Sequence, residues 1–247
     1  MLKAIGSSNN FRSAYALLKV PSEIARHKVV MMSTDFSLLV KTAPRIILGS
    51  SSSSRRQLMD QVVAEHGFTY EVLTADIDEK AIRVDDPQEL VMKLAHAKAD
   101  AIIEKLKTAA KDSGNNIIIE GLLITCDQVV THEGRILEKP EDAAEAREFI
   151  SGYGRAPAST IGSTVCTNLA TGQRLESLDI ATIHFTHIPE ETAEILIKEG
   201  DVMWCAGGLM VEHPLVVPHV TNMEGGQDAV MGLSKATVVK LITEALS

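Results

Sequence analysis

Residues 45–59 read Arg-Ile-Ile-Leu-Gly-Ser-Ser-Ser-Ser-Ser-Arg-Arg-Gln-Leu-Met, and this stretch decides how the chain begins to fold. An apolar, β-branched run ends at Gly49, five serines follow, and the pattern from Arg55 onward is helical. The stretch therefore predicts a buried strand, a turn and the N-terminus of a helix.

The serines and arginines of this turn predict a site for phosphate oxygens. Backbone N–H groups at a helix start lack intrahelical acceptors and carry positive partial charge. Ser50, Ser52, Arg55 and Arg56 gather hydroxyl and guanidinium donors around that end. A flexible serine-rich linker is the competing interpretation. A linker, however, needs neither a buried strand before it nor paired cations after it.

Bulk properties indicate a globular protein large enough for one α/β domain. Of its 247 residues, 45% are hydrophobic and 23% are charged, which is typical of globular rather than disordered or membrane-embedded chains. The net charge of −9 argues against nucleic acid as a partner, because affinity for its backbone needs accumulated Lys and Arg. No apolar run approaches the roughly 20 residues that span a bilayer, so we expect no membrane partner.

The N-terminal segment differs from the rest of the chain. Residues 1–42 are locally basic and weakly patterned, so we treat them as an extension and residues 43–247 as a single α/β domain. An acid-poor segment that contains arginine also suits an organelle transit peptide. The three cysteines, at positions 126, 166 and 205, are far apart and predict reduced thiols rather than disulfides or a zinc site. We expect a cytoplasmic protein, with organelle targeting as the alternative.

The remaining patterns predict a mixed α/β fold. A half-buried strand is expected at residues 68–73, and a central strand at 117–126, ending in Asp127. A long helix is expected from Pro87 to about Lys111, with Asp86 as its N-cap. We further expect helices at 140–150, 189–198 and 234–246, a hairpin of strands at 160–170 and 175–185, and loops at 111–116, 204–208 and 223–227.

Several charged residues stand out because of where these patterns place them. Lys98 falls in the middle of the apolar arc of its helix, so its ammonium must reach solvent or meet an anion. Asp127 is expected at the C-terminal edge of a buried strand, where open α/β sheets bind ligands, although a turn or capping acid is the plainer interpretation. A hairpin that turns at residues 133–134 returns Lys139 to this edge. An acidic turn that ends in Glu79 follows the second strand.

Taken together, these motifs resemble those of the Maf family, from about residue 45 to the C-terminus. Residues 49–56 resemble the family's Ala-Ser-x-Ser-Pro-Arg-Arg signature, residues 76–79 its acidic loop, and residues 94–99 its Leu-Ala-x-x-Lys-Ala helix. Residues 126–130 are similar to Ala-Asp-Thr-Val-Val, and residues 136–140 to its Leu-x-Lys-Pro turn. Each block alone is a weak signal, but their joint order and spacing are strong.

The resemblance implies an ITPase-like (Maf/Ham1-type) α/β fold, with a mixed, bent central sheet flanked by helices and two lobes around a cleft. It implies hydrolysis of a nucleoside triphosphate to the monophosphate and pyrophosphate, helped by a divalent cation: Mg²⁺, with Mn²⁺ or Co²⁺ as alternatives. It also implies a homodimer. The apolar segments 209–211 and 215–217 support a dimer weakly, if the core does not absorb them.

Residue chemistry and the resemblance together assign roles. Asp127 and Lys139 are the expected catalytic residues, because the first can take a proton from water and the second can balance developing charge. The expected metal ligands are Asp127 and Glu79. The expected substrate-binding residues are Ser50, Ser52, Arg55, Arg56, Glu79 and Lys98.

Departures from the family pattern leave substrate choice open. Ser54 stands where one branch has Arg and another Trp, Gln128 replaces Thr, and Arg155 replaces His. Arg56 can stand in for the missing Arg if Ser53, which lacks the fixed φ of the family's proline, lets the turn shift its register. On that basis the sequence favours pyrimidine nucleotides such as dTTP and UTP, with 7-methyl-GTP as the competing substrate. A nucleotide-binding regulatory protein with little or no catalysis is the alternative of another class. Trp204 either stacks on a base or packs beside the glycines that follow it.

Overall fold

The computed structural model describes residues 44–112 and 119–247, so the extension expected at residues 1–42 and most of the loop expected at 111–116 lie outside the described residues. The strands are β1 (Ile46–Gly49), β2 (Glu71–Leu73), β3 (Leu122–His132), β4 (Arg135–Leu137), β5 (Ala158–Asn168), β6 (Arg174–Phe185) and β7 (Val220–Glu224). The α-helices are α2 (Ser53–His66), α3 (Pro87–Asp112), α4 (Ala143–Gly152), α5 (Glu190–Glu199), α6 (Gln227–Val230) and α7 (Lys235–Ala245). Short 3₁₀ helices are η1 (Glu79–Ala81), η2 (Asp201–Trp204), η3 (Ala206–Gly208) and η4 (Val217–His219).

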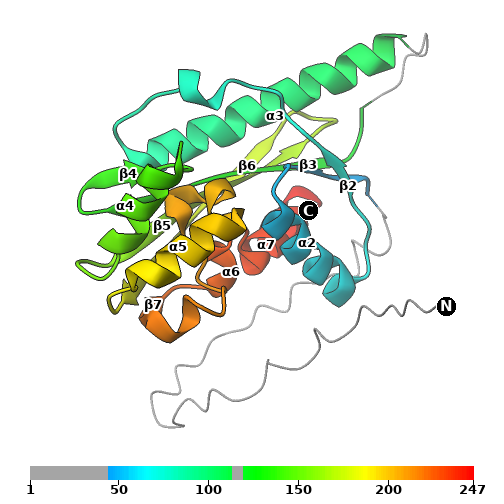
Figure 1. The fold of residues 1–247 in the computed structure, drawn as a ribbon. Coiled ribbons are helices and arrows are strands. Elements are labelled where there is room, and N and C mark those ends of the chain that lie inside the picture. Colours follow the sequence, from blue (N-terminus) through cyan, green and yellow to red (C-terminus); the bar gives the residue numbers. More distant parts are fainter. Residues whose placement is uncertain (1–43, 113–118) are drawn as a thin grey trace, which may run out of the picture. The chain divides into compact units, whose positions relative to one another are not determined.

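The strands form one mixed sheet, as the sequence predicts. Its order is β2-β1-β3-β5-β6-β7, and β4 pairs with the end of β3. Strand β1 runs parallel to β2 and β3, whereas the other pairs are antiparallel. Figure 1 shows α3 on one side of the sheet and α2 and α7 on the other. Accordingly, Ile47 packs with Ile102 of α3, while Ile46 and Leu48 pack with apolar residues of α2 and α7.

The opening stretch folds as predicted, into strand β1, a turn and helix α2. Ser52 is the N-cap, and its hydroxyl accepts the backbone N–H of Arg55 at 3.3 Å. Gly49 ends the strand where α3 packs closely against it. A Cβ at this position would lie only 2.7 Å from side-chain atoms of Ile102 and Thr125, so glycine is required for this approach.

The long helix and the C-terminal helix also begin where the sequence predicts. Asp86 accepts the backbone N–H of Glu89 at 2.8 Å and so caps α3, which Pro87 opens. Ser234 caps α7 in the same way, by accepting the N–H of Thr237 at 3.3 Å. Among the described residues, none of the helices combines the length and the apolar character needed to cross a membrane.

Strand β3 begins and ends later in the chain than predicted, at Leu122 and His132 rather than at residues 117 and 126, and this changes the position of Asp127. The strand was expected to end at Asp127 but continues to His132, because β5 pairs with it along nearly its whole length. On the opposite edge of β3, β1 pairs only as far as Thr125, and β4 pairs only from Val130. Asp127 therefore lies in mid-strand, in the gap between the end of β1 and the start of the β4 pairing.

Other differences are local. Strand β2 covers only residues 71–73 of the expected strand, because Phe68 turns into the core beneath α2. Helix α4 begins at Ala143 rather than at residue 140, since Asp142 caps it by accepting the N–H of Glu145. The loop expected at residues 204–208 is mostly 3₁₀ helix, and the one expected from residue 223 begins inside β7.

The apolar segments that supported a homodimer are largely part of the core. Val211 and Val216 are buried, and Leu209 and Met210 pack against the same clusters. In these two segments only Val217 is a large exposed hydrophobic residue. This particular argument for a dimer, that the core leaves the segments uncovered, is therefore wrong.

Candidate active site

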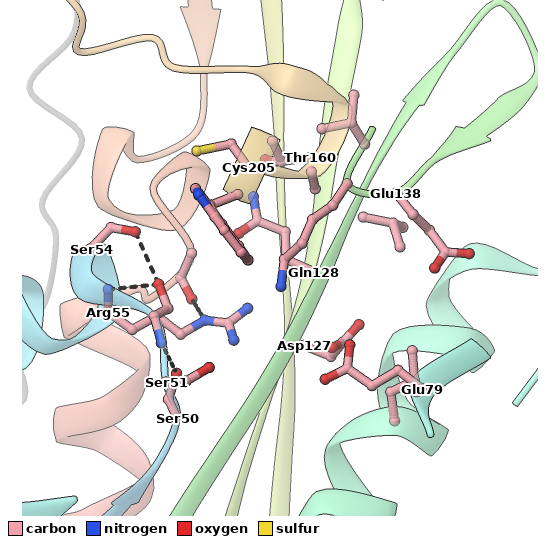
Figure 2. A pocket seen from close by; sticks show the side chains of 18 of the residues that line it. Ser50, Ser51, Ser54, Arg55, Glu79, Asp127, Gln128, Glu138, Thr160 and Cys205 are labelled. Atoms are coloured by element: carbon pink, nitrogen blue, oxygen red, sulfur yellow. Dashed lines mark hydrogen bonds between the residues drawn. The ribbon is translucent and has the colours of Figure 1, made fainter. Parts of the chain in front are cut away.

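The gap beside Asp127 opens into a pocket with a volume of about 970 Å³, which is within the range of small-molecule sites. Figure 2 shows residues of the β1–α2 turn on one side of it and Asp127 and Glu79 on the other. Each of the predicted site residues lines this pocket, although they come from distant parts of the sequence: Ser50, Ser52, Arg55, Arg56, Glu79, Lys98, Asp127 and Lys139.

The wall made by the β1–α2 turn presents hydrogen-bond donors. The Ser50 hydroxyl accepts the backbone N–H of Ser52 at 3.2 Å, and the Ser52 hydroxyl lies 3.0 Å from that of Ser54. As the first two residues of α2, Ser53 and Ser54 have backbone N–H groups without intrahelical acceptors. This wall therefore has the composition of an anion-binding helix N-terminus.

Arg55 anchors this wall to the rest of the fold. Its Nε donates to the backbone carbonyl of Gly232 at 2.9 Å, and its Nη1 donates to that of Cys126 at 3.1 Å. The guanidinium thus ties α2 to β3 and to the loop before α7, while its charge remains in the pocket. From the sequence, Arg55 was predicted only to bind substrate, whereas in the structure it also holds three segments of the fold together.

This anchoring predicts that Arg55→Lys destabilises the protein. An ammonium cannot reproduce the fork of donors that reaches both carbonyls, and a hydrogen bond from a charged group is worth roughly 1.5–3 kcal/mol. Arg56→Lys is the matched control, because Arg56 is exposed on the pocket rim and should change little. Chemical denaturation of both variants measures the effect. Equal midpoints for the two variants would show that the carbonyl contacts do not contribute.

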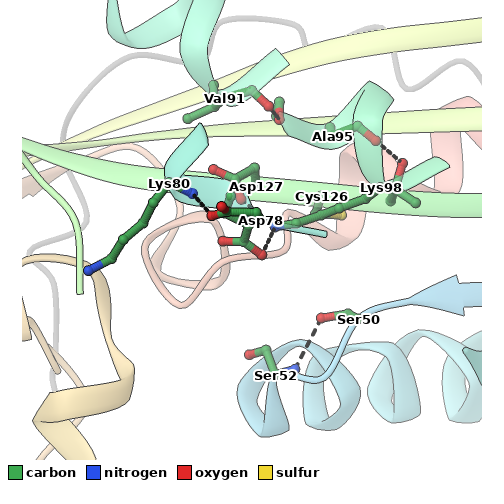
Figure 3. Close-up of polar contacts among 12 residues, drawn as sticks. Ser50, Ser52, Asp78, Lys80, Val91, Ala95, Lys98, Cys126 and Asp127 are labelled. Carbon is green, nitrogen blue, oxygen red and sulfur yellow. Dashed lines mark hydrogen bonds and ion pairs between the residues drawn. The ribbon is translucent and has the colours of Figure 1, made fainter. Parts of the chain in front are cut away.

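The opposite wall carries a cluster of one buried lysine, one buried carboxylate and one partly exposed carboxylate. Lys98 Nζ lies 2.5 Å from Asp127 Oδ1 and 3.0 Å from Glu79 Oε1. Lys98 is 8% exposed and Asp127 is 6% exposed. Figure 3 shows the Lys98 side chain reaching from α3 toward Asp127. Of the two outcomes expected for its ammonium, reaching solvent or meeting an anion, the structure shows the second.

The surroundings shift the pKa values of the two carboxylates in opposite directions. Burial raises the pKa of Asp127, although the nearby Lys98 and Arg55 charges oppose this shift. For Glu79, partial burial would raise the pKa, but Lys98, Lys139 and Arg55 outweigh it and lower the pKa. Asp127 is thus more basic than an ordinary aspartate, and Glu79 stays ionised to lower pH than an ordinary glutamate.

The donor set fits a cation that is shared with a substrate. Among residues 44–112 and 119–247, no group of three or more His, Cys, Asp or Glu side chains is arranged to hold a metal by itself. Asp127 and Glu79 offer carboxylate oxygens on the same pocket wall, and each uses one oxygen on Lys98. Mg²⁺ is commonly held by one or two carboxylates together with phosphate oxygens and water.

The end of the pocket beyond Gln128 has a different character. It is lined by Trp204, Cys205 and Glu212, which follow helix α5 in the chain. Burial raises the pKa of the Glu212 carboxyl. Burial also raises the pKa of the Cys205 thiol to about 11, so this thiol is a poor nucleophile at neutral pH. Sequence analysis missed Glu212. The one feature of the sequence that could have indicated Glu212 is its place as a single acid directly after the apolar run 209–211.

Two of the three departures from the family pattern lie in the pocket. Ser54 lines the donor wall, and Gln128 donates its side-chain amide to the Val230 carbonyl at 2.8 Å. Arg155 instead forms an exposed ion pair with Glu133 at 2.9 Å, outside the residues that line the pocket. Ser54 and Gln128 are therefore placed to affect a ligand directly, whereas Arg155 is not.

Comparisons with known proteins agree with this geometry. The profile of the family described as Maf-like protein matches residues 45–245. The chain is 39% identical over 203 residues to "7-methyl-GTP pyrophosphatase" of Dictyostelium discoideum, covering 82% of this chain and 98% of that protein. It is 28% identical over 201 residues to "Nucleoside triphosphate pyrophosphatase" of Salinispora tropica, covering 81% and 83%.

A solved structure of a nucleoside-triphosphatase / dITP/XTP pyrophosphatase from Mycobacterium abscessus aligns with a TM-score of 0.34 and 11% identity, covering 59% of this chain and 74% of that one. The family match spans the strand, the donor turn and both walls of the pocket, from Arg45 to Ala245. On that evidence, the chain belongs to the Maf-like protein family.

Proposed function

We propose that this protein hydrolyses nucleoside triphosphates to the monophosphate and pyrophosphate. The observation that carries the proposal is one pocket with two complementary walls: phosphate donors at the start of α2, and Asp127 beside Lys98 and Glu79 opposite them. Donors of the first kind bind phosphate oxygens, and a buried carboxylate with a raised pKa takes a proton from water. The pyrophosphatase names of the relatives support the same reaction.

In the proposed mechanism, the donor wall holds the triphosphate and the opposite wall activates water. Ser50, Ser52 and the first amides of α2 bind phosphate oxygens, and Arg55 neutralises charge on them. Asp127 accepts a proton as the water oxygen bonds to phosphorus and the P–O bond between the α- and β-phosphates breaks. Lys139 then balances the negative charge that develops on the leaving pyrophosphate.

Lys98 acts as a positioning residue for the carboxylates in this scheme. Its ammonium contacts both Asp127 and Glu79, so it fixes their separation and limits the rise in the pKa of Asp127. We further propose that Asp127 and Glu79 hold a divalent cation, Mg²⁺ or else Mn²⁺ or Co²⁺, together with the phosphates. When bound, such an ion supplies positive charge that neutralises the triphosphate.

For the base, we propose 7-methyl-GTP rather than the pyrimidine nucleotides that the sequence favoured. The relative named for 7-methyl-GTP shares 39% identity over nearly its whole length, against 28% for the Salinispora relative with the general name. The pocket end that contains Glu212 also suits a base with positive charge. Both supports are independent of Arg56, on which the pyrimidine preference rested.

The test is a comparison of kcat/KM for pyrophosphate release from 7-methyl-GTP, GTP, ITP, dTTP, UTP and CTP with Mg²⁺. We expect 7-methyl-GTP to exceed UTP and dTTP by at least about 10-fold, roughly 1.4 kcal/mol in transition-state binding. A preference of that size for a pyrimidine nucleotide would restore the earlier expectation. Tight binding without turnover of any nucleotide would instead favour the regulatory alternative.

Assembly and location are further proposals. We propose a homodimer, which the family resemblance supports. We also propose that nucleic acid is not a partner, which the net charge of −9 supports, and that the protein is cytoplasmic without a membrane partner. Light scattering that reports a monomer at micromolar concentration would reject the dimer. Organelle localisation of the full-length chain in cells would reject the cytoplasmic assignment.

A further inference from the structure

The only tryptophan of the chain is exposed at the pocket. Trp204 is the last residue of η2, lines the pocket and is 77% exposed. Of the two alternatives that the sequence left open, packing beside the following glycines is thus not what the indole does. A large aromatic surface that is exposed to water at a ligand pocket indicates a contact surface for a bound ligand.

The backbone beneath Trp204 is held firmly. Val202 is buried in the core cluster that α4 and α5 share, and its carbonyl accepts the N–H of Cys205 at 3.2 Å. Gly207 donates its backbone N–H to the Glu138 carbonyl at 2.8 Å. The indole is therefore mounted on a fixed support, which reduces the entropy cost of binding a flat partner.

The two ends of the pocket differ in composition. Arg55 and Arg56 lie at the start of α2, whereas Trp204 and Glu212 follow α5, with the Lys139 charge near Cys205. Figure 2 shows Cys205, the residue after Trp204, beyond Gln128 and away from Ser50 and Asp127. Burial raises the pKa of the Glu212 carboxyl, against the opposing effects of a backbone hydrogen bond and of His213. A matching ligand thus carries its phosphate groups at the α2 end and a flat base that reaches Trp204 and Glu212 at the other end.

We propose that Trp204 is the base-stacking residue of this site and that it selects a purine that carries positive charge, such as one alkylated at N7. Alkylation at N7 places a positive charge on the purine ring, and the indole face attracts cations more strongly than the other aromatic side chains. Glu212 adds a carboxylate that accepts N–H groups of such a base. This inference rests on the proposed function, because the phosphate end orients the nucleotide.

The first test compares Trp204→Ala and Trp204→Phe with the wild-type enzyme on 7-methyl-GTP, GTP and UTP. Stacking on an aromatic side chain is lost in the alanine variant, so kcat/KM for 7-methyl-GTP should fall about 10-fold or more, mainly through KM. The phenylalanine variant should recover most of this loss, and GTP and UTP should lose less. Ile195→Ala, an exposed apolar residue of α5 outside the pocket, is the matched control and should change nothing.

The second test does not depend on turnover. Since Trp204 is the only tryptophan, its fluorescence reports its own surroundings, and titration with 7-methyl-GMP should quench it more strongly than titration with GMP. Quenching without pyrophosphate release from any nucleotide would support the stacking residue and reject the proposed reaction. Normal turnover with equal kcat/KM in the wild-type and Trp204→Ala enzymes would overturn the stacking role and leave the reaction intact. If Trp204→Ala altered the molar mass in light scattering but not kcat/KM, Trp204 would serve assembly rather than base stacking, and the stacking role would also be overturned.

Discussion

Replacing Asp127 with asparagine is expected to lower turnover by about 10²-fold or more while leaving nucleotide binding largely unchanged. The amide has nearly the same shape and keeps a carbonyl oxygen for the Lys98 ammonium, which lies 2.5 Å from the carboxylate in the native protein. It cannot, however, take a proton from water. Single-turnover rates and equilibrium binding of 7-methyl-GTP separate the two effects.

Asp76→Asn is the matched control for this substitution. Asp76 also pairs with a lysine, Lys105 at 2.5 Å, but it does not line the pocket. Loss of a solvent-exposed pair should leave turnover within about 2-fold of the wild-type rate, because such pairs are worth at most roughly 1 kcal/mol and lie away from the reacting atoms. Near-normal turnover of Asp127→Asn would reduce Asp127 to a structural partner of Lys98.

Lys98→Met is expected to lower both stability and turnover. The ammonium lies between two carboxylates, one of them buried, so methionine leaves Asp127 without its partner. Removing one member of a buried ion pair costs roughly 3–5 kcal/mol. An ammonium that merely reached solvent would predict unchanged stability, so denaturation at neutral pH distinguishes the two situations. Lys105→Met, on the same helix but in an exposed pair, is the control.

The pH dependence of this variant has a defined sign. Burial already raises the pKa of Asp127 and Lys98 opposes that shift, so removal of Lys98 should raise the pKa further. A carboxyl whose pKa is higher in the folded protein than in the unfolded chain takes up protons on folding. Its contribution to stability is present at low pH and is lost as the pH rises through the folded-state pKa.

The destabilisation caused by Lys98→Met should therefore be smaller in acid than at neutral pH. The acid limb of its residual pH–rate profile should also move to higher pH, because the base becomes protonated earlier on acidification. A pH-independent loss of stability, with an unmoved acid limb, would mean that Lys98 does not control the ionisation of Asp127.

The predictions that succeeded from sequence rest on local signals. Strand β1, the turn and α2 were predicted from three signals that are adjacent in the sequence: an apolar run, a serine N-cap and a helical pattern. Lys98 was placed correctly on the buried face of its helix by periodicity alone. Local patterns could not name its partners, because Asp127 and Glu79 come from separate segments that only the sheet brings together.

Positions that depend on pairing between distant strands were less accessible. The length of β3, and with it the mid-strand location of Asp127, is decided by the pairing with β5 and by where β1 and β4 stop. The exposure of Trp204 depends on which side chains fail to cover it, and no sequence pattern carries that information. Glu212 was missed because an acid beside an apolar run resembles an ordinary surface residue until the run folds back on the pocket.

The most direct test of the central claim is to identify the products of 7-methyl-GTP hydrolysis by the wild-type enzyme with Mg²⁺. If Asp127 and the donor wall of α2 act on the bond between the α- and β-phosphates, 7-methyl-GMP and pyrophosphate appear in equal amounts, and Asp127→Asn forms neither at a comparable rate. Release of orthophosphate with 7-methyl-GDP, or equal rates for the wild-type and Asp127→Asn enzymes, would contradict it.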